Sequence, residues 1–312
     1  MEKHNTFLQD MPKVWGDNWS VTSEIGRLRA VLMHSPGREI ENITDPAAVY
    51  FRDFIDVEKA RWEHEQLVKT YRENGVKVHL IEETDSTCPN AMYCHDLILG
   101  TPEGVIVTRP GIKIRQKEVK YAAQTASSLG IPIVKTIHGE GIFDGACVVW
   151  VDRETVIAGT GSRCNQAGLK QISDTFADMG VKNIITLSIA RNQNHLDGFL
   201  SIVDRHLVVT YPYITPHIVY EELEKRGFDF VEIPSFEEKI NFAANSVALE
   251  PGKIIMPLGA PRTAEMLREK GVEVIELDLD EIKKGGGSVH CLTAFLKRDD
   301  IPVYPVSGAS SC

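Results

Sequence analysis

The side chains of this chain that could do chemistry lie in four short polar segments; the first three come just before a stretch that is predicted to be a strand, and the fourth is a glycine-rich run near the end of the chain. The segments are Asn90–Asp96, Phe143–Ala146, Asn194–Gly198 and Gly285–Cys291. Each alone has an ordinary explanation, because polar residues before a strand commonly form turns or caps, and a single cysteine is commonly a small buried hydrophobe. Together they supply a thiol (Cys291), an imidazole (His195) and three carboxylates (Asp96, Asp144 and Asp197). Nucleophilic catalysis by cysteine requires groups of these kinds.

The excess of carboxylates around one thiol indicates the kind of molecule that would be attacked. Ordinary acyl transfer needs oxyanion donors rather than several acidic groups. Carboxylates suit a planar cation with many N–H donors, and guanidinium fits because its N–H fork pairs bidentately with them. A nearby histidine or the cation itself would favour the reactive thiolate, and a carboxylate beside the histidine would fix its tautomer.

Two other kinds of site are alternatives at this stage. Cys94, His95, His195, His290 and Cys291 could bind zinc, but the paired ligand spacing of known zinc sites is absent. The glycine run before Cys291 could be only a flexible turn. It is not G-x-G-x-x-G and no helix pattern follows it, which disfavours a dinucleotide site.

A repeating unit of sequence would position these segments. An apolar strand, a short polar turn, a second apolar strand and a helix recur at a spacing of roughly 50 residues. The second strands begin at Val105, Val156, Leu207 and Ile254, and a partial earlier copy lies at Leu28–Met33. Helix-period apolar positions predict helices over residues 57–74, 117–129, 166–179, 217–226 and 262–270. We therefore expect an α/β fold in which five units close into a ring, so that equivalent positions converge at one end of its axis. The alternative is an ordinary α/β sheet with coincidental spacing.

Length and composition exclude several classes of protein. The chain has 312 residues, 44 acidic and 34 basic side chains and a net charge of -10. No linker divides it, so we expect one domain over residues 1–312. No apolar run exceeds strand length and no signal peptide is apparent, so we expect no membrane partner. The acidic balance disfavours a nucleic-acid partner. Six scattered cysteines without a C-x-x-C pair predict a reduced, cytoplasmic protein.

At these residues the chain resembles the guanidino-group-modifying enzymes, which include arginine deiminases, dimethylarginine dimethylaminohydrolases, agmatine deiminases and amidinotransferases. The resemblance extends from about Glu24 to Thr293. The segments that carry it are Glu24–His34 with Pro36–Glu39, Asn90-x-x-Tyr93-x-x-Asp96, His195-Leu196-Asp197 and Gly285–Cys291. The family folds as a five-bladed α/β propeller of ββαβ repeats, which agrees with the repeating units. The first two segments look most like arginine deiminases.

The resemblance implies a catalytic role for three residues. Cys291 would attack the guanidino carbon and form a covalent thiouronium intermediate. His195 would protonate the departing amine and then activate water, while Asp144 would orient and stabilise His195. The resemblance implies no metal and no organic cofactor.

It also implies how the substrate would be bound. Asp96 and Asp197 would accept the guanidinium N–H groups, and Asn90 and Tyr93 stand where the family has its substrate-binding Asn and aromatic residue. The remaining pair, Arg115 and Arg163, follow Asp96 and Asp144 at equal distances along the chain. They match arginines that hold a substrate α-carboxylate.

The implied activity is a hydrolase that converts free L-arginine, or a close analogue, to citrulline and ammonia. Gly285–Gly287 stand where arginine deiminases usually carry an Arg, and Cys147 stands where the family usually has a second Asp. These departures lean towards amidinotransferases, so transfer of the amidino group to an amine is the alternative. A non-catalytic binding protein of similar shape, like the ribosome anti-association factors, would not need the Cys, His and Asp set. The expected partner is a small guanidino compound, and a homodimer is the default assembly.

Overall fold

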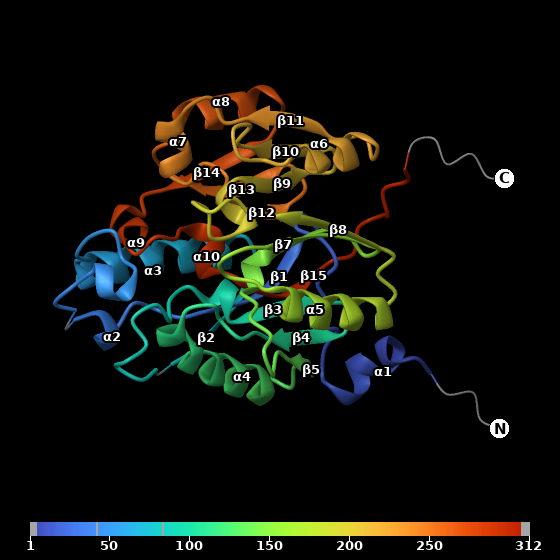
Figure 1. Cartoon of the computed structure of the whole chain (residues 1–312), viewed down its shortest axis with the longest axis horizontal. Coiled ribbons are helices and arrows are strands. Elements are labelled where there is room, and N and C mark those ends of the chain that lie inside the picture. Colours follow the sequence, from blue (N-terminus) through green and yellow to red (C-terminus); the bar gives the residue numbers. More distant parts are fainter. Residues whose placement is uncertain (1–4, 42, 83, 307–312) are drawn as a thin grey trace.

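The strands of the protein form five separate three-stranded sheets rather than one continuous sheet (Figure 1). The computed structural model describes residues 5–41, 43–82 and 84–306, so Cys312 lies outside the described residues. In every sheet the middle strand pairs antiparallel with one neighbour and parallel with the other. The sheets are β15 (Ala294–Arg298), β1 (Leu28–Met33) and β2 (Lys77–Leu80); β3 (Ile98–Thr101), β4 (Gly104–Val107) and β5 (Ile133–Thr136); β6 (Val148–Asp152), β7 (Thr155–Thr160) and β8 (Asn183–Ser188); β9 (Leu200–Asp204), β10 (Leu207–Thr210) and β11 (Asp229–Glu232); and β12 (Val247–Glu250), β13 (Lys253–Pro257) and β14 (Glu273–Leu277). The expected five units are confirmed, and the single-sheet alternative is wrong.

One helix crosses from the middle strand to the outer strand of each unit. These helices are α3 (Val57–Glu73), α4 (Val119–Ser128), α5 (Gln166–Asp178), α6 (His217–Glu224) and α8 (Pro261–Glu269). They agree with the predicted helices to within a few residues. The start of α5 shows the local cause, because the Asn165 side chain accepts a hydrogen bond from the Gly168 amide and caps the first turn. Its end is marked by Gly180, which has a positive φ of 86° that suits glycine.

Shorter helices lie outside this pattern. They are α1 (Phe7–Val14), α2 (Arg38–Glu41), α7 (Phe236–Ile240), α9 (Asp280–Lys284) and α10 (Val289–Leu292), with 3-10 turns η1 (Ala47–Val49), η2 (Cys94–Asp96), η3 (Lys113–Lys117), η4 (Gly145–Cys147) and η5 (Leu196–Gly198). Among the residues described, no helix has the length and apolar character needed to cross a membrane.

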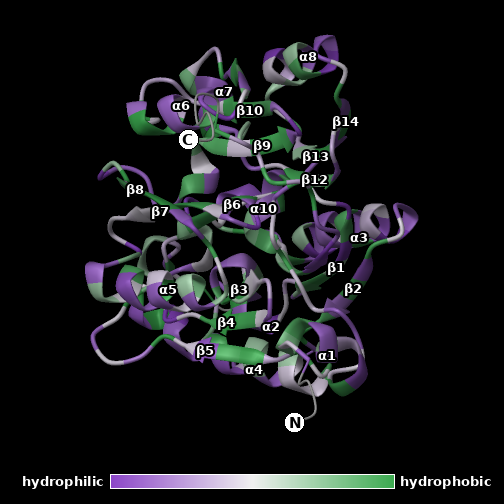
Figure 2. Ribbon diagram, turned by 90° about the vertical axis from the view of Figure 1, so that its right-hand side faces the viewer, coloured by the Kyte–Doolittle hydropathy of each residue, from purple (hydrophilic) through white to green (hydrophobic). Residues whose placement is uncertain are grey.

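Burial falls from the inner strand of each sheet to its outer strand. Every residue of β3 and β6 is buried, whereas β2 and β5 have exposed residues at both ends. Figure 2 shows that strand β4 is mostly hydrophobic, whereas helices α5 and α8 carry both hydrophilic and hydrophobic residues. The apolar inner strands therefore form the core around the axis, and the amphipathic helices cover it.

The first unit is completed by the far end of the chain. Strand β15 pairs antiparallel with β1, from Leu28 opposite Arg298 to Leu32 opposite Ala294. The sequence showed this unit as only partial, because its inner strand follows Cys291 rather than preceding β1. The ring is thus closed by a strand that directly follows the predicted nucleophile.

Candidate active site

Each of the five units contributes a polar side chain from the residues that lead into its inner strand. Asp96 ends η2 before β3, Asp144 precedes η4 and β6, Asp197 lies in η5 before β9, and Cys291 lies in α10 before β15. The fifth unit supplies Asn245, just before β12. Around the axis, η2 contacts α10 and η4, and η4 contacts η5. The pseudo-symmetry of the ring therefore brings these side chains together.

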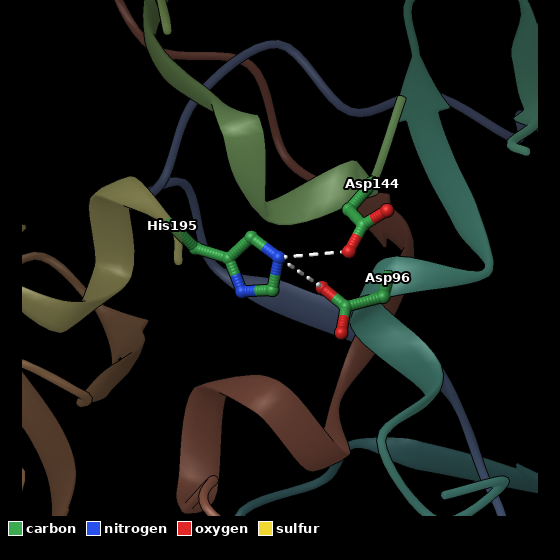
Figure 3. A group of neighbouring side chains, drawn as sticks. All are labelled: Asp96, Asp144 and His195. Carbon is green, nitrogen blue, oxygen red and sulfur yellow. Dashed lines mark hydrogen bonds and ion pairs between the residues drawn. The ribbon is translucent and has the colours of Figure 1, made fainter. Parts of the chain in front are cut away.

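His195 lies between two carboxylates (Figure 3). Its Nε2 is 2.9 Å from Oδ2 of Asp144 and 3.6 Å from Oδ1 of Asp96. Burial alone would lower the pKa of His195, but the charge of Asp96 and the hydrogen bond to Asp144 outweigh it, so the pKa is raised. When Nε2 donates its proton to Asp144, Nδ1 is the nitrogen that can exchange a proton with another molecule.

Arg115 is buried and holds Asp96 in place. It forms an ion pair with Oδ2 of Asp96, and its Nε donates to Glu118 at 2.9 Å. Its Nη2 donates to the backbone oxygens of Asn90 and Tyr93 at 3.3 and 2.9 Å. Oδ1 of Asp96 is different, because it is buried and has no hydrogen-bond partner in the part of the chain that the structure describes.

The thiol of Cys291 lies in a cluster with Asp197 and Asn245. Sγ is 3.3 Å from Oδ2 of Asp197, and Nδ2 of Asn245 donates to Sγ at 3.2 Å and to the same Oδ2 at 3.0 Å. Oδ1 of Asn245 accepts a hydrogen bond from the backbone amide of His290 at 3.0 Å. Asn245 thus holds both the start of helix α10 and the thiol of Cys291.

His290 contacts the carboxylate of Asp197 and supports its position in the cluster. Its Nδ1 is 3.1 Å from Oδ2 of Asp197 and its Nε2 is 3.3 Å from Glu24. Burial opposes protonation, but the hydrogen bonds and charges of these two carboxylates raise the pKa of His290 to about 9. The imidazole is therefore a cation at neutral pH, and it holds the pKa of Asp197 below its usual value despite burial.

The surroundings of Cys291 favour the neutral form of its thiol. Burial, together with the negative charges of Asp197 and Asp96, raises the pKa of Cys291 well above its usual value. A cation placed between these carboxylates would offset their charge and lower the pKa of the thiol.

A cavity opens above these groups, and we call it the Arg163 cavity. It is lined by Tyr50, Asn90, Tyr93, Asp96, Ile112, Arg115, Arg163, Asn194, His195, Gly285–Gly287 and Cys291. Seven of the nine sequence-predicted site residues line it: Asn90, Tyr93, Asp96, Arg115, Arg163, His195 and Cys291. The other two reach it through contacts, since Asp144 bonds His195 and Asp197 contacts Cys291.

Arg163 is the guanidinium at this cavity that has the fewest protein contacts. Its Nη1 is 4.0 Å from Asp144, and its guanidinium carbon lies 5.8 Å from the centre of the exposed Tyr50 ring. Asn90 uses its side-chain amide to bond the Val49 carbonyl at 3.0 Å, and Tyr93 donates its hydroxyl to the Ile282 carbonyl at 2.7 Å. These bonds hold the Tyr50 segment and the glycine run against the site.

The glycines before Cys291 are required by close packing. A Cβ on Gly287 would lie 2.5 Å from Cε1 of Tyr93 and 2.9 Å from Cβ of Cys291, and one on Gly285 would lie 2.1 Å from the Tyr93 hydroxyl. The run is therefore a backbone that passes directly over an aromatic ring, which explains its composition without a phosphate-binding role.

Asp96, Asp144 and His195 could also offer ligand atoms to a metal ion, since one atom from each lies within 4.8 Å of the others. Arg115 and Arg163 already bring positive charge to the two carboxylates. These positive charges would repel a divalent cation placed between the carboxylates. The arrangement therefore suits a histidine held by two carboxylates better than it suits a metal ion. The zinc alternative does not fit either, because His95 and His290 point to Thr293 and to the Asp197 and Glu24 carboxylates.

A ring of five ββαβ units with a thiol, an imidazole and paired carboxylates at its axis defines the class of guanidino-group-modifying enzymes. Residues 48–298 match the family described as N,N dimethylarginine dimethylhydrolase, eukaryotic. This match covers most of the chain, and the chain belongs to that family.

Known relatives agree with this assignment. The chain is 30% identical over 239 residues to an N(G),N(G)-dimethylarginine dimethylaminohydrolase of Mycobacterium tuberculosis, which covers 77% of this chain and 76% of the relative. It is 23% identical to an arginine deiminase of Mycoplasma capricolum, over 90% of this chain and 98% of the relative. An amidinotransferase of the saxitoxin biosynthetic pathway from Microseira wollei superposes with a TM-score of 0.77 at 15% identity, over 92% and 99% of the two chains. The superfamily is thus established, but the predicted closeness to arginine deiminases in particular is not supported.

The sequence reasoning missed three members of the site: Asn245, His290 as a support and Glu24. The first strand of this fifth unit was recognised from the sequence at Val247. By analogy with the other units, the residues just before it could have pointed to Asn245. The contact between His290 and Glu24 has no local signal, because the strand that follows Glu24 packs beside the last strand only after ring closure.

Proposed function

We propose that this chain is a cysteine-dependent hydrolase of the guanidino group of free L-arginine or a close analogue, and that residues 1–312 act as one catalytic unit. With arginine the products would be citrulline and ammonia. The relatives act on arginine derivatives by name, and methylated arginine is the close analogue that they suggest.

One observation carries the proposal. Oδ1 of Asp96 is buried, lacks a hydrogen-bond partner among the described residues and belongs to a carboxylate that lines the same cavity as Cys291 and His195. Nε2 of His195 lies 3.6 Å from this oxygen, which is too far for a hydrogen bond, so the buried oxygen can still accept one from a charged donor. A guanidinium supplies donors to Asp96 on one edge and to Asp197 on the other, which leaves its central carbon facing the thiol.

The reaction follows from these positions. The bound cation lowers the pKa of Cys291, the thiol releases its proton to water, and the thiolate sulfur then forms a bond to the guanidino carbon. The His195 imidazolium gives its Nδ1 proton to the departing nitrogen as the C–N bond breaks, and a thiouronium intermediate remains on Cys291. Neutral His195 then removes a proton from water, a C–O bond forms, the C–S bond breaks and the ureido product leaves. Asp144 holds His195 in the orientation that both steps use.

We assign different roles to the two arginines that the sequence paired. Arg163 would anchor an α-carboxylate, because it lines the cavity with only a long contact to Asp144. Arg115 would act as a positioning residue for Asp96, because its Nε, Nη1 and Nη2 already donate to protein oxygens. Asn90 and Tyr93 would shape the cavity wall around the alkyl chain of the substrate.

The proposal is tested by incubating the enzyme with arginine, dimethylarginine and agmatine and identifying the products by mass spectrometry. A ureido product with release of an amine, and a covalent adduct on Cys291 in quenched samples, would support it. Absence of both the adduct and any ureido product from all three compounds would refute it.

Amidino transfer is a second candidate because a further cavity, lined by cations, also reaches Cys291. In that reaction an amine would replace water in the second half of the cycle. Arginine alone would then give no citrulline, and ornithine would form only when an amine acceptor is added.

A further inference from the structure

The Arg163 cavity opens into a larger cavity, which we call the mouth cavity. The linings of the two cavities share Tyr50, Ile112, Arg163 and Asn194. The Arg163 cavity has a volume of about 60 Å³, whereas the mouth cavity has about 590 Å³, which is within the range of sites that hold a whole small molecule. The inner cavity therefore suits the guanidino end of a substrate, and the other end of the substrate must lie in the mouth cavity.

The mouth cavity is lined by two cations, Arg163 and Lys113. The side chain of Arg163 is only 11% exposed and also lines the inner cavity, whereas Lys113 begins η3 and is exposed. None of the described residues that line the mouth cavity is Asp or Glu. The charge of this lining is therefore positive, and it suits a carboxylate at the outer end of the substrate.

The aspartates below the mouth cavity already have other partners. Oδ1 of Asp144 accepts a hydrogen bond from the Gly111 amide at 2.8 Å, and Oδ2 lies 2.9 Å from Nε2 of His195. Asp96 and Asp197 bind the guanidinium in the proposed reaction. A free amino acid would bring an α-ammonium to the mouth cavity together with its carboxylate. Neutral oxygens of the lining could accept a hydrogen bond from this ammonium, but they do not offset its charge.

Much of the remaining wall of the mouth cavity is apolar. Ala48, Ile112 and Ile114 line it, together with Tyr50. Such a wall suits methylene groups or an uncharged amide substituent better than an ammonium, because an ammonium loses its hydration there. The charges and the wall thus favour the same kind of molecule, a carboxylate on an otherwise uncharged chain.

We propose that the substrate of this site is a guanidino acid without an α-ammonium, whose carboxylate binds at Arg163 and Lys113. Two kinds of compound share this chemistry, namely an unsubstituted ω-guanidino acid and an arginine whose α-nitrogen is acylated. The inference rests on the proposed function and narrows its substrate class. The reaction is unchanged, since water resolves the intermediate and 5-guanidinopentanoate would give 5-ureidopentanoate and ammonium.

The test compares 5-guanidinopentanoate with arginine, which differs from it only by the α-ammonium, and includes Nα-acetylarginine. We expect kcat/KM for at least one of the two compounds that lack the ammonium to exceed that for arginine by about tenfold, because a charge near two cations is repelled. The preference should shrink as salt is added, since Lys113 is exposed. The better of the two compounds identifies which kind of guanidino acid the site takes.

Two variants locate the source of the preference. Lys113→Glu supplies the carboxylate that the lining lacks, so kcat/KM for arginine should rise relative to that for 5-guanidinopentanoate by about tenfold or more. Lys117→Gln is the matched control, because Lys117 is an exposed cation of the same turn η3 that does not line the mouth cavity, and it should keep the wild-type preference. A wild-type kcat/KM for arginine that equals or exceeds those of both other compounds would overturn the inference, as would an unchanged preference in Lys113→Glu.

Binding to Cys291→Ser separates this inference from the proposed function. Isothermal titration calorimetry should show that the better of the two compounds binds about tenfold more tightly than arginine, and that adding Lys113→Glu removes the difference. This pattern of binding, without a ureido product from any guanidino compound in the wild type, would count against the proposed function alone. Binding of arginine as tight as that of the other two compounds would overturn the inference even if all three were hydrolysed.

Discussion

Replacing Asp96 by Asn tests the electrostatic core of the site. The substitution keeps the shape of the side chain but removes the charge that faces both the substrate and His195. A hydrogen bond to a charged group is worth about 1.5–3 kcal/mol, so kcat/KM should fall roughly 10- to 100-fold. Asp96 is also the strongest of the charges that raise the pKa of His195. In the proposed mechanism the protonated imidazole donates to the leaving amine, so activity should be lost as pH rises through this pKa, and the loss should begin at lower pH in Asp96→Asn.

The assay is the pH profile of kcat/KM together with urea unfolding, because Arg115 loses a charged partner in the same variant. Glu118→Gln is the matched control. Glu118 is the other carboxylate that pairs with Arg115, and Glu118 does not line the cavity. Burial raises the pKa of Glu118 to about 7, so this side chain is partly protonated at neutral pH and its amide analogue should cost little. If Asp96→Asn kept kcat/KM within about twofold, or if Glu118→Gln matched its loss, the role of Asp96 in binding the cation would be refuted.

Four further outcomes are expected. Cys291→Ser should abolish turnover with little change in the urea midpoint, and an active variant would contradict the assignment of the nucleophile. Arg163→Ala should raise KM for arginine far more than for agmatine, which lacks the carboxylate; equal changes would remove the anchor role. Gly287→Ala should reduce activity strongly in steady-state assays, because its Cβ would lie 2.5 Å from the Tyr93 ring, and unchanged kinetics would show that the run is not sterically required. His290 has a folded pKa of about 9 against an ordinary 6.5, so its contribution to the free energy of unfolding should be complete below pH 6.5 and lost as pH rises through 9. Urea unfolding between pH 6.5 and 9 should show a fall in the free energy of unfolding of the wild type that His290→Gln lacks. If this free energy changed with pH in parallel for both proteins, the role of His290 would be contradicted.

The fold could be predicted from the sequence because its evidence is local. Each helix has apolar positions at helix period and each unit has two short apolar runs around a polar turn, so four units could be recognised without knowledge of their partners. The first unit could not, because its inner strand β15 lies at the other end of the chain and pairs with β1 only in the ring. The crossing helices were placed to within a few residues because caps such as Asn165 and glycines such as Gly180 mark their ends.

The candidate site was predictable in its residues and less so in its contacts. Aspartates before successive predicted strands, together with a cysteine in a glycine-rich run, indicated a shared pocket, and the ring brings them together. Sequence spacing gave Arg115 and Arg163 the same role, although only the buried Arg115 is held by Glu118 and two backbone oxygens. Equal spacing places the two residues at equivalent backbone positions in their units. The residues that their side chains contact differ between the units. The same limit hid the pairing of His290 with Glu24, which depends on contacts between opposite ends of the chain.

The position of β15 has a consequence for how the enzyme comes into being. Strand β15 is the inner strand of the first sheet, but it is synthesised after the other strands. Cys291 lies directly before it in the chain. The other four units have all three of their strands before this point in the chain, so Cys291 and the last strand of the ring are placed together. Pairing of such distant segments is slow relative to local folding. A growing chain therefore lacks the cluster of Cys291 with its carboxylates until the ring closes, so the last step of folding is also the step that would complete the proposed active site.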